Sequence, residues 1–257
     1  MNKNSLPTAL AVVLSIALLT GCKSSDVKSP AQLPPGGVGT TVAPEPPSPR
    51  EIIRAAALQP LAPATGDGWR SLFDGSSLTG WRVTDFGNAG RVELQQGLMV
   101  FRMGAPFVGL NYTNEIPRVN YEVTLEAMRI EGDDFFCGLT FPVGDSYASL
   151  IVGGWGGSLV GISSIDNNDA SENETTQNMS FQTGHWYRIR VRVSEQKLEA
   201  WVDQKKVADV VRAGRQFSLR PGDIELSKPF GLASWATSAA FRDLKLRAVA
   251  CPDQPTQ

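Results

Sequence analysis

The residues best suited to chemistry lie between 153 and 174. The run Gly153-Gly154-Trp155-Gly156-Gly157 surrounds one large ring with glycines, which let a backbone approach a ligand closely. Carboxylate and amide side chains follow it, namely Asp166, Asn167, Asn168, Asp169, Glu172, Asn173 and Glu174. Aromatic rings stack on sugar faces and carboxylates and amides bind hydroxyls, so the stretch predicts a carbohydrate site with Trp155 and Asn173 as contacts. A solvated acidic loop, with the Trp tucked into the core edge, would have the same pattern.

The same oxygen-rich stretch makes Ca²⁺ a candidate cofactor. Its spacing differs from an EF-hand, because Ala170 and Ser171 stand where that loop has its fifth-position ligand and its sixth-position glycine. Zinc is not expected, since no Cys/His cluster is present to hold it. We therefore name no metal ligand and keep calcium as an alternative.

Four carboxylates are candidate catalytic bases. Asp133 and Asp134 precede the strongly apolar run 135–137, where neighbouring phenyl rings would raise the pKa of a carboxyl group toward the value a general base needs. Asp166 and Glu174 are the candidates from the acidic stretch. The alternative is that Asp133 and Asp134 are ordinary turn residues without a catalytic role.

Two cationic or titratable side chains outside these segments are also candidates. Arg118 precedes a predicted strand, where it could stabilise an enolate or bind a hydroxyl, although arginines at loop ends are usually solvated. His185 is the single histidine and stands at the entry to another strand. Its place favours a structural position over a general base or a metal ligand.

A charged ladder is predicted on two strands. Glu122 and Glu126 share one strand face, but at roughly 3.3 Å per residue they lie about 13 Å apart, farther than the paired carboxyls of glycosidases. Arg188, Arg190 and Arg192 form a positive row on another strand. Opposite rows would pair on the outer face of a sheet. The alternative is a polar face on which Glu126 and Arg190 contact sugar hydroxyls.

The elements that must position these residues are strands. Segments 121–127, 187–193 and 241–247 alternate apolar and polar residues, which predicts one face in a core and one in water. Segments 198–203 and 204–207 read as a strand, a turn and a strand. No long amphipathic helical pattern occurs, and Gly and Pro separate the strands, so we predict an all-β fold, a two-sheet β-sandwich.

The N-terminus has the pattern of a lipoprotein signal. Lys3 precedes the apolar run 6–19, which is too short to span a bilayer comfortably, and Leu19-Thr20-Gly21-Cys22 resembles a bacterial lipoprotein cleavage site. By that resemblance, residues 1–21 are removed, Cys22 carries the lipid anchor, and Lys23 favours the outer membrane. We expect a protein held at the cell envelope.

Composition predicts where the folded domain begins. Residues 22–65 are rich in Pro, Gly, Ser and Ala, which predicts a flexible tether with at most one short helix at 50–58. Residues 66–249 suffice for one domain, and 250–257 form a tail.

Charge and cysteine content bound the partners and the covalent structure. A net charge of −2 provides no basic field, so a nucleic-acid partner is not expected. Beyond Cys22, the cysteines are Cys137, in an apolar run, and Cys251. A free buried thiol and a disulfide between the two are both compatible with a secreted protein.

Four segments carry a resemblance to a known family. The opening residues 69–81 (WRSLFDGSSLTGW), the strand entry 184–187 (GHWY) and the hairpin 202–207 resemble the 3-keto-disaccharide hydrolase family, as does the closing strand 241–247. In the middle the family has an Asn-Ser-Gly strand and then a strand with glutamate and glutamine ending in Asp. This chain has other residues there, which marks a divergent subfamily.

The resemblance implies a concanavalin A-like jelly-roll and activity on carbohydrate. It implies a hydrolase or lyase of 3-keto-glycosides, in which a carboxylate removes the C2 proton and the C1 substituent leaves. One alternative is a noncatalytic, lectin-like glycan-binding module, and another is a structural envelope lipoprotein. A carbohydrate ligand and a lipid anchor are the expected partners.

Overall fold

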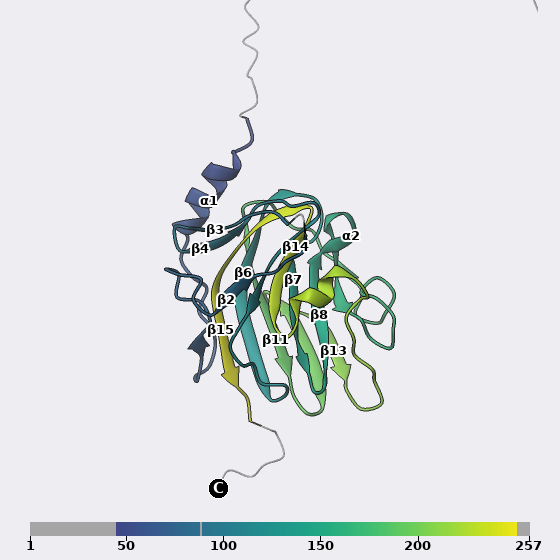
Figure 1. The fold of residues 1–257 in the computed structure, drawn as a ribbon. Coiled ribbons are helices and arrows are strands. Elements are labelled where there is room, and N and C mark those ends of the chain that lie inside the picture. Colours follow the sequence, from purple (N-terminus) through teal and green to yellow (C-terminus); the bar gives the residue numbers. More distant parts are fainter. Residues whose placement is uncertain (1–44, 88, 251–257) are drawn as a thin grey trace, which may run out of the picture. The chain divides into compact units, whose positions relative to one another are not determined.

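A computed structural model describes residues 45–87 and 89–250 (Figure 1). The predicted signal peptide, Cys22 and tether residues up to 44 lie outside the described residues, as does Cys251. In the described ranges, no helix combines the length and the apolar character needed to cross a membrane.

Two antiparallel sheets make up the domain, which confirms the predicted all-β class. The eight-stranded sheet has the order β13-β12-β11-β6-β15-β4-β3, with β1 beside β15. Its strands are β1 (Arg70–Ser71), β3 (Val92–Gln95), β4 (Leu98–Phe101), β6 (Tyr121–Gly132), β11 (Trp186–Val193), β12 (Lys197–Val202), β13 (Lys205–Val211) and β15 (Thr237–Ala248).

The seven-stranded sheet has the order β10-β9-β8-β7-β14-β5-β2. Its strands are β2 (Trp81–Val83), β5 (Phe107–Tyr112), β7 (Cys137–Val143), β8 (Ser146–Gly153), β9 (Leu159–Ser163), β10 (Gln177–Asn178) and β14 (Gly231–Trp235). The predicted strands at 121–127, 187–193, 198–203 and 241–247 are all present, in the eight-stranded sheet.

The main core lies between the sheets, because alternate residues of each strand point inward. Val123 and Leu125 of β6 meet Leu139 and Phe141 of β7 in one buried cluster. Each such side chain contributes about 1.5–3 kcal/mol when it is removed from water. Cys137 lies in this core as a free thiol, and burial raises its pKa.

The outer face of β6 differs from the prediction that it lies in water. Glu122 is 1% exposed and Glu126 is 3% exposed. Helix α1 (Pro49–Ala57) and the residues after it cover this face, where Ile53 and Ala56 pack on Met128 and neighbouring side chains. The alternation of β6 therefore reflects two buried environments, one apolar and one ionic.

Helix α1 belongs to the packed domain, although composition places it in the flexible tether 22–65. Ser48 and Glu51 form a reciprocal capping box at its N-terminus. After the helix, the Arg242 side chain donates to the carbonyls of Gln59 (2.8 Å) and Pro60 (3.0 Å). An amphipathic turn of helix and these carbonyl contacts order a segment whose composition resembles a linker.

The outer face of the seven-stranded sheet is covered in turn by the segment 217–228, which includes the 3-10 helix η1 (Asp223–Ser227). Leu219 and Ile224 from this segment pack against Phe107, Ile151 and other residues of the sheet. Sheet side chains can therefore reach solvent only where this cover leaves a gap.

Candidate functional site

A pocket of 460 Å³ remains between the seven-stranded sheet and its cover, and we call it the tryptophan pocket. It is lined by Phe107, Asp134, Phe135, Ile151, Trp155, Ser163, Arg220, Pro221, Gly222, Asp223, Ile224 and Trp235. The lining combines aromatic rings with two carboxylates and one guanidinium. A mostly apolar hollow with few polar groups is the usual composition of a small-ligand site.

Two tryptophans expose their rings at this pocket. Trp155 is 43% exposed and Trp235 is 37% exposed. Trp155 lies in α2 (Gly154–Gly157), a single turn in which its own backbone is left-handed, at φ 49° and ψ 56°. This conformation is unfavourable for a bulky residue and is typical of sites where function requires a particular orientation. The Phe107 ring meets Trp235 edge to face, with centroids 4.6 Å apart, and supports it from below.

Arg129 braces the Trp155 turn from the eight-stranded sheet. Its Nη2 donates to the carbonyls of Gly157 (3.0 Å), Asp134 (3.1 Å) and Gly153 (3.3 Å). The residue is 6% exposed, and its burial lowers the pKa of the guanidinium. One buried cation thus fixes the backbone on both sides of Trp155 and at Asp134.

Asp134 is the predicted catalytic carboxylate that lines the tryptophan pocket. Its Oδ1 accepts from the backbone N–H of Phe135 at 2.7 Å, and its Oδ2 accepts from Gly156 at 3.5 Å. Its backbone N–H donates to Thr237 Oγ1 at 3.0 Å. Asp133 is exposed and is not in the pocket lining. The structure therefore separates two neighbours that the sequence treats alike.

The predicted acidic candidates Asp166 and Glu174 pair with Arg215 outside this pocket. Arg215 lies 2.5 Å from a carboxylate oxygen of each. The pKa of Asp166 is lowered mainly by the Gln216 backbone N–H, and that of Glu174 mainly by its hydrogen bond from Arg215. The pairing joins the acidic loop to Arg215, which lies just before the covering segment 217–228.

Asn173 supports the fold of the same loop. Its Nδ2 donates to the carbonyls of Ile162 (2.8 Å) and Asp169 (2.8 Å), and its Oδ1 accepts from Thr175. The loop contacts the tryptophan pocket through Asp169, which pairs with Arg220 at 2.8 Å. The stretch 153–174, expected to form one site, is thus divided into a turn that lines the pocket and a bracing loop.

Glu126 and Arg190 lie on the outer face of the eight-stranded sheet, in the ladder predicted as their structural alternative. Glu126 pairs with Arg188 (3.0 Å) and Arg242 (2.6 Å), while Glu122 pairs with Arg190 (2.8 Å). Arg190 also lies over the Trp201 ring, 3.6 Å from its centroid. These charges neutralise one another beneath α1 and beside it.

Arg118 and His185 lie away from the tryptophan pocket. Arg118 donates to the carbonyl of Gly144 (2.7 Å) and to Tyr147 Oη (3.0 Å), and thereby holds the β7–β8 turn. His185 is exposed and packs against the Tyr187 ring. Within residues 45–87 and 89–250, no group of three or more His, Cys, Asp or Glu side chains is placed to hold a metal ion.

The second tryptophan and two charged members of the pocket were missed by the sequence reading: Trp235, Arg220 and Asp223. Trp235 is the residue before the β14–β15 turn, at Ala236, whose φ is 44°. A tryptophan beside a turn is a local pattern like that of Trp155, and this pattern could have identified Trp235 as a candidate from the sequence. Arg220 and Asp223 flank a Pro-Gly turn, whose contact with the sheet depends on tertiary packing.

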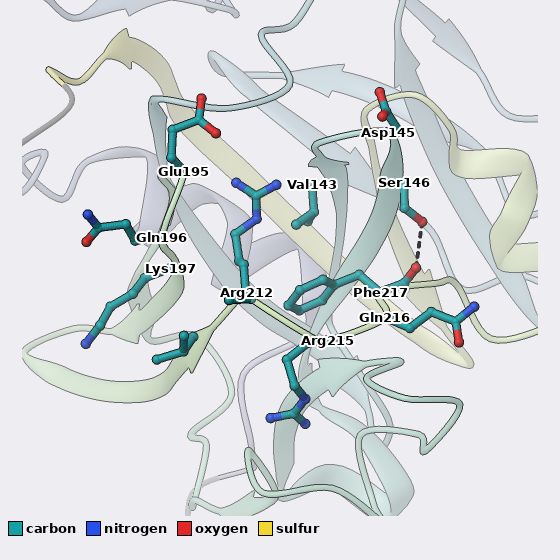
Figure 2. A pocket seen from close by; sticks show the side chains of 12 residues that line it. Val143, Asp145, Ser146, Glu195, Gln196, Lys197, Arg212, Arg215, Gln216 and Phe217 are labelled. Atoms are coloured by element: carbon teal, nitrogen blue, oxygen red, sulfur yellow. Dashed lines mark hydrogen bonds between the residues drawn. The ribbon is translucent and has the colours of Figure 1, made fainter.

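A larger hollow of 740 Å³ lies elsewhere, between the β7–β8 and β11–β12 turns, and Figure 2 shows its side chains. Its lining includes Asp145, Glu195, Lys197, Arg212 and Phe217 but no Trp or Tyr. It contains none of the predicted site residues. The tryptophan pocket is therefore the better candidate for the chemistry expected from the sequence.

Comparisons with known proteins agree with this architecture. Residues 68–247 match the family described as 3-keto-alpha-glucoside-1,2-lyase-like domain. A galectin-like protein of unknown function from Bacillus subtilis is similar in structure, with a TM-score of 0.50 and 9% identity over 71% of this chain and 96% of that one. This likeness confirms the predicted jelly-roll type of sandwich.

Two other solved structures have lower similarity. The transglycosylase Crh5 in complex with NAG has a TM-score of 0.48 and 12% identity, over 72% of this chain and 86% of that one. The carbohydrate-binding module CBM66 from Bacillus subtilis has a TM-score of 0.43 and 14% identity, over 66% and 96%. No curated protein sequence matches the chain.

Proposed function

Because the chain belongs to the 3-keto-alpha-glucoside-1,2-lyase-like family, we propose that its tryptophan pocket binds a carbohydrate. The observation that carries this proposal is the pair of half-exposed rings, Trp155 and Trp235, at one hollow. A tryptophan ring presents a flat apolar surface to the C–H face of a sugar ring. Two such rings provide two stacking surfaces.

The polar groups of the pocket complement those rings. Asp134 and Asp223 offer carboxylate oxygens to sugar hydroxyls, and Arg220 offers N–H donors. The volume of 460 Å³ falls in the range of small-ligand sites, which is about 300–1,000 Å³. The Arg129 brace supports the proposal, because a pre-ordered ligand turn loses little entropy on binding.

Cleavage of 3-keto-glycosides is the catalytic form of this proposal. The Asp134 carboxylate removes the C2 proton, and the electron pair forms a C2–C3 enolate whose oxygen accepts a hydrogen bond from the Arg220 guanidinium, which also pairs with Asp169. When the C3 ketone re-forms, a C1=C2 double bond appears and the C1–O bond breaks. The leaving oxygen takes the proton from Asp134. Later addition of water across the double bond would make the net reaction a hydrolysis.

Family membership and the presence of Asp134 with Arg220 in one pocket favour the catalytic form. The alternative is a lectin-like module that binds the sugar without cleaving it, and in this module the same two tryptophan rings would contact the sugar. In that case the carboxylates contact hydroxyls only. A structural envelope role would leave the pocket without a sugar ligand.

The binding test compares Trp155→Ala and Trp235→Ala with Trp201→Ala, whose ring lies on the outer face of the other sheet. Titration calorimetry with 3-keto-glycosides and their unoxidised parents should show at least about tenfold weaker binding for the two pocket variants, since each loses a stacking surface. Equal affinity in all three variants would contradict the assignment of the pocket.

The catalytic test uses Asp134→Asn, with Asp133→Asn as the matched neighbour outside the pocket. We expect release of reducing sugar from 3-keto-glycosides only, loss of at least about a hundredfold in kcat for Asp134→Asn, and little change for Asp133→Asn. Binding without turnover in the unaltered protein would leave the lectin-like alternative. Turnover retained in Asp134→Asn would reject Asp134 as the base.

We also propose that lipid on Cys22 holds the domain at the cell envelope, in the outer membrane. The proposal is supported by the signal pattern that ends at Leu19-Thr20-Gly21-Cys22. Metabolic labelling with a radioactive fatty acid, followed by membrane fractionation, should give a labelled outer-membrane protein. A Cys22→Ser chain should be unlabelled; a membrane-bound, unlabelled native chain would reject the anchor.

A further inference from the structure

The larger hollow lies where the two sheets meet at their turns, and we call it the hairpin pocket (Figure 2). The β7–β8 turn contributes Asp145, the β11–β12 turn contributes Glu195, and the segment after β13 contributes Arg212. In the view of Figure 2 the Arg212 guanidinium lies between Glu195 and Val143, with Asp145 on the opposite rim. None of these residues belongs to the tryptophan pocket.

Two of the five charged side chains that line the hairpin pocket are neutralised inside the protein. Lys197 pairs with Asp209 at 2.8 Å. Arg215 pairs with Asp166 and Glu174 at 2.5 Å each. These cations are therefore occupied by internal partners, and the charges of the pocket that can attract a ligand come from other side chains.

The remaining charges are one guanidinium and two carboxylates. Within the described part of the chain, Asp145, Glu195 and Arg212 make no ion pair. Glu195 accepts one hydrogen bond from Asn120 Nδ2 at 3.3 Å, and its carboxylate keeps further acceptor capacity. The pocket therefore presents both signs of charge, with one more negative group than positive.

Arg212 is held in place across the two turns. Its Nη1 donates to the carbonyl of Ser194, at the β11–β12 turn. Its Nη2 passes so close to Gly144, in the β7–β8 turn, that a Cβ atom there would lie 2.7 Å away. The guanidinium is thus oriented before any ligand arrives, with donors beyond the one that Ser194 uses.

The floor of the hairpin pocket is apolar. Val143 is 4% exposed and Phe217 is 7% exposed, and both belong to the main core. Phe217 is too deeply buried to serve as a stacking surface for a sugar, and the lining holds no Trp or Tyr. This floor suits a short aliphatic group more than a pyranose ring.

We propose that the hairpin pocket binds a zwitterionic ligand of the amino-acid or short-peptide class. The ligand carboxylate pairs with the Arg212 guanidinium, an ammonium group pairs with one of the two rim carboxylates, Glu195 or Asp145, and the aliphatic part covers Val143. A simple dicarboxylate would meet two carboxylates, and a simple diamine would meet a guanidinium. A ligand with both charges satisfies each group of the pocket.

The test is titration calorimetry of the full chain with the dipeptide alanyl-lysine, which carries one carboxylate and two ammonium groups. The comparison ligands lack one charged group or both: glutarate has no ammonium, cadaverine has no carboxylate, and glucose has neither. We expect saturable binding of alanyl-lysine and at least about tenfold weaker binding of the other three.

Three variants locate the site. Arg212→Met and Glu195→Gln should each weaken alanyl-lysine binding at least about tenfold, and Arg82→Met, an exposed arginine of β2, should not. The thermal midpoint of unfolding shows whether Arg212→Met disturbs folding. If it does, Glu195→Gln still tests the site, because the glutamine keeps the hydrogen bond to Asn120.

Absence of saturable alanyl-lysine binding would overturn the proposal. So would binding that Glu195→Gln leaves unchanged. Glucose binding that is lost in Arg212→Met would also overturn it, in favour of a second sugar site. Sugar titrations of the tryptophan pocket do not bear on these outcomes, because the two pockets share no lining residue.

Discussion

Individual carboxylates of this protein differ in role because their neighbours differ. Asp134 keeps an oxygen at a hollow lined by rings, while Asp166 and Glu174 share one arginine and Glu126 lies between two. An ion-paired carboxylate has its acceptor sites filled and its charge balanced. A carboxylate at a partly apolar pocket keeps capacity for a ligand, which is why Asp134 carries the proposed chemistry.

Arg129 should control both the stability and the ligand affinity of the Trp155 turn. Arg129→Met removes the donor shared by three carbonyls, and each buried polar group left without a partner costs about 1–3 kcal/mol. We expect a loss of about 3 kcal/mol in the free energy of unfolding by urea, together with weaker sugar binding. Arg129→Lys should recover part of both.

Arg102→Met is the control for this loss of charge. Arg102 pairs with Glu93 at a partly exposed site, where such a pair contributes about 1 kcal/mol or less. If Arg129→Met cost no more than Arg102→Met, the guanidinium would not be the brace described above.

Asp74 should make the opening turn of the domain sensitive to acid. Backbone N–H groups of Ser76 and then Ser77 lower the pKa of Asp74 from 3.8 to about 2. A lowered pKa in the folded protein means that the stabilisation is fully present above pH 3.8 and is lost as the pH falls through about 2. The melting temperature of Asp74→Asn should therefore lie below that of the native chain at pH 7, and the two should converge near pH 2.

The matched variant is Asp85→Asn, which changes another exposed loop carboxylate with one backbone bond, from Gly87 at 3.2 Å. At pH 7 the melting temperature of Asp85→Asn should differ less from that of the native chain than the melting temperature of Asp74→Asn does. A difference for Asp74→Asn that stays constant from pH 7 to pH 2 would mean that the Asp74 charge makes no contribution.

At the scale of elements, strand β6 and helix α1 depend on each other. The inner face of β6 packs on the other sheet, and its outer face places Met128 and Ile130 under α1. Arg188 and Arg242, beside the buried Glu126, donate to carbonyls of the chain after the helix. The helix therefore covers apolar surface while the following segment satisfies buried cations, which need hydrogen-bond partners.

Ile53 tests whether the helix is part of the cooperative domain. Ile53 is 2% exposed, so Ile53→Ala should lower the free energy of unfolding by about 2–4 kcal/mol in urea titrations. Leu58→Ala is the control, because Leu58 is 82% exposed and its change should stay within about 0.5 kcal/mol. If neither variant changed the free energy of unfolding, the helix would move independently of the sandwich.

At the scale of the whole domain, both sheets pack on each other through their inner faces and are covered on part of their outer faces. The core lies between them, α1 covers one outer face, and the segment 217–228 covers the other. Residues between 211 and 217 line the hairpin pocket and residues 220–224 line the tryptophan pocket, so adjoining parts of one segment contribute to both. The two hollows differ in character, because one is lined by tryptophan rings and the other by charged side chains.

Cys137 reports the cooperativity of this layered structure. It is fully buried in the core, where burial raises the pKa of its thiol, so the reactive thiolate forms only when the sheets separate. In a chain with Cys22→Ser and Cys251→Ser, a thiol reagent should label Cys137 no faster than global unfolding measured in the same urea series. Rapid labelling in native buffer would show that β7 opens locally.

The sequence by itself determined the fold class and much of the strand set. Segments such as 187–193 alternate because one side faces the core, and this period can be read without any tertiary information. It also pointed to Asp134 and Trp155, which line one pocket in the structure, because an acidic residue before an apolar run and a ring among glycines are unusual local patterns. The glutamate and arginine rows could be paired in advance for the same reason: a sheet places opposite residues together.

Only the tertiary structure decided which candidates meet. Asp133 and Asp134 are equivalent in sequence, and the direction of the chain at one turn sends a single member into the pocket. Trp235, Arg220 and Trp155 come from segments distant along the chain, and the fold of the cover over the seven-stranded sheet brings them together. Local patterns report the environment of one face of one element. Sites built by contacts between distant segments depend on how those faces pack, and a local sequence pattern holds no information about that packing.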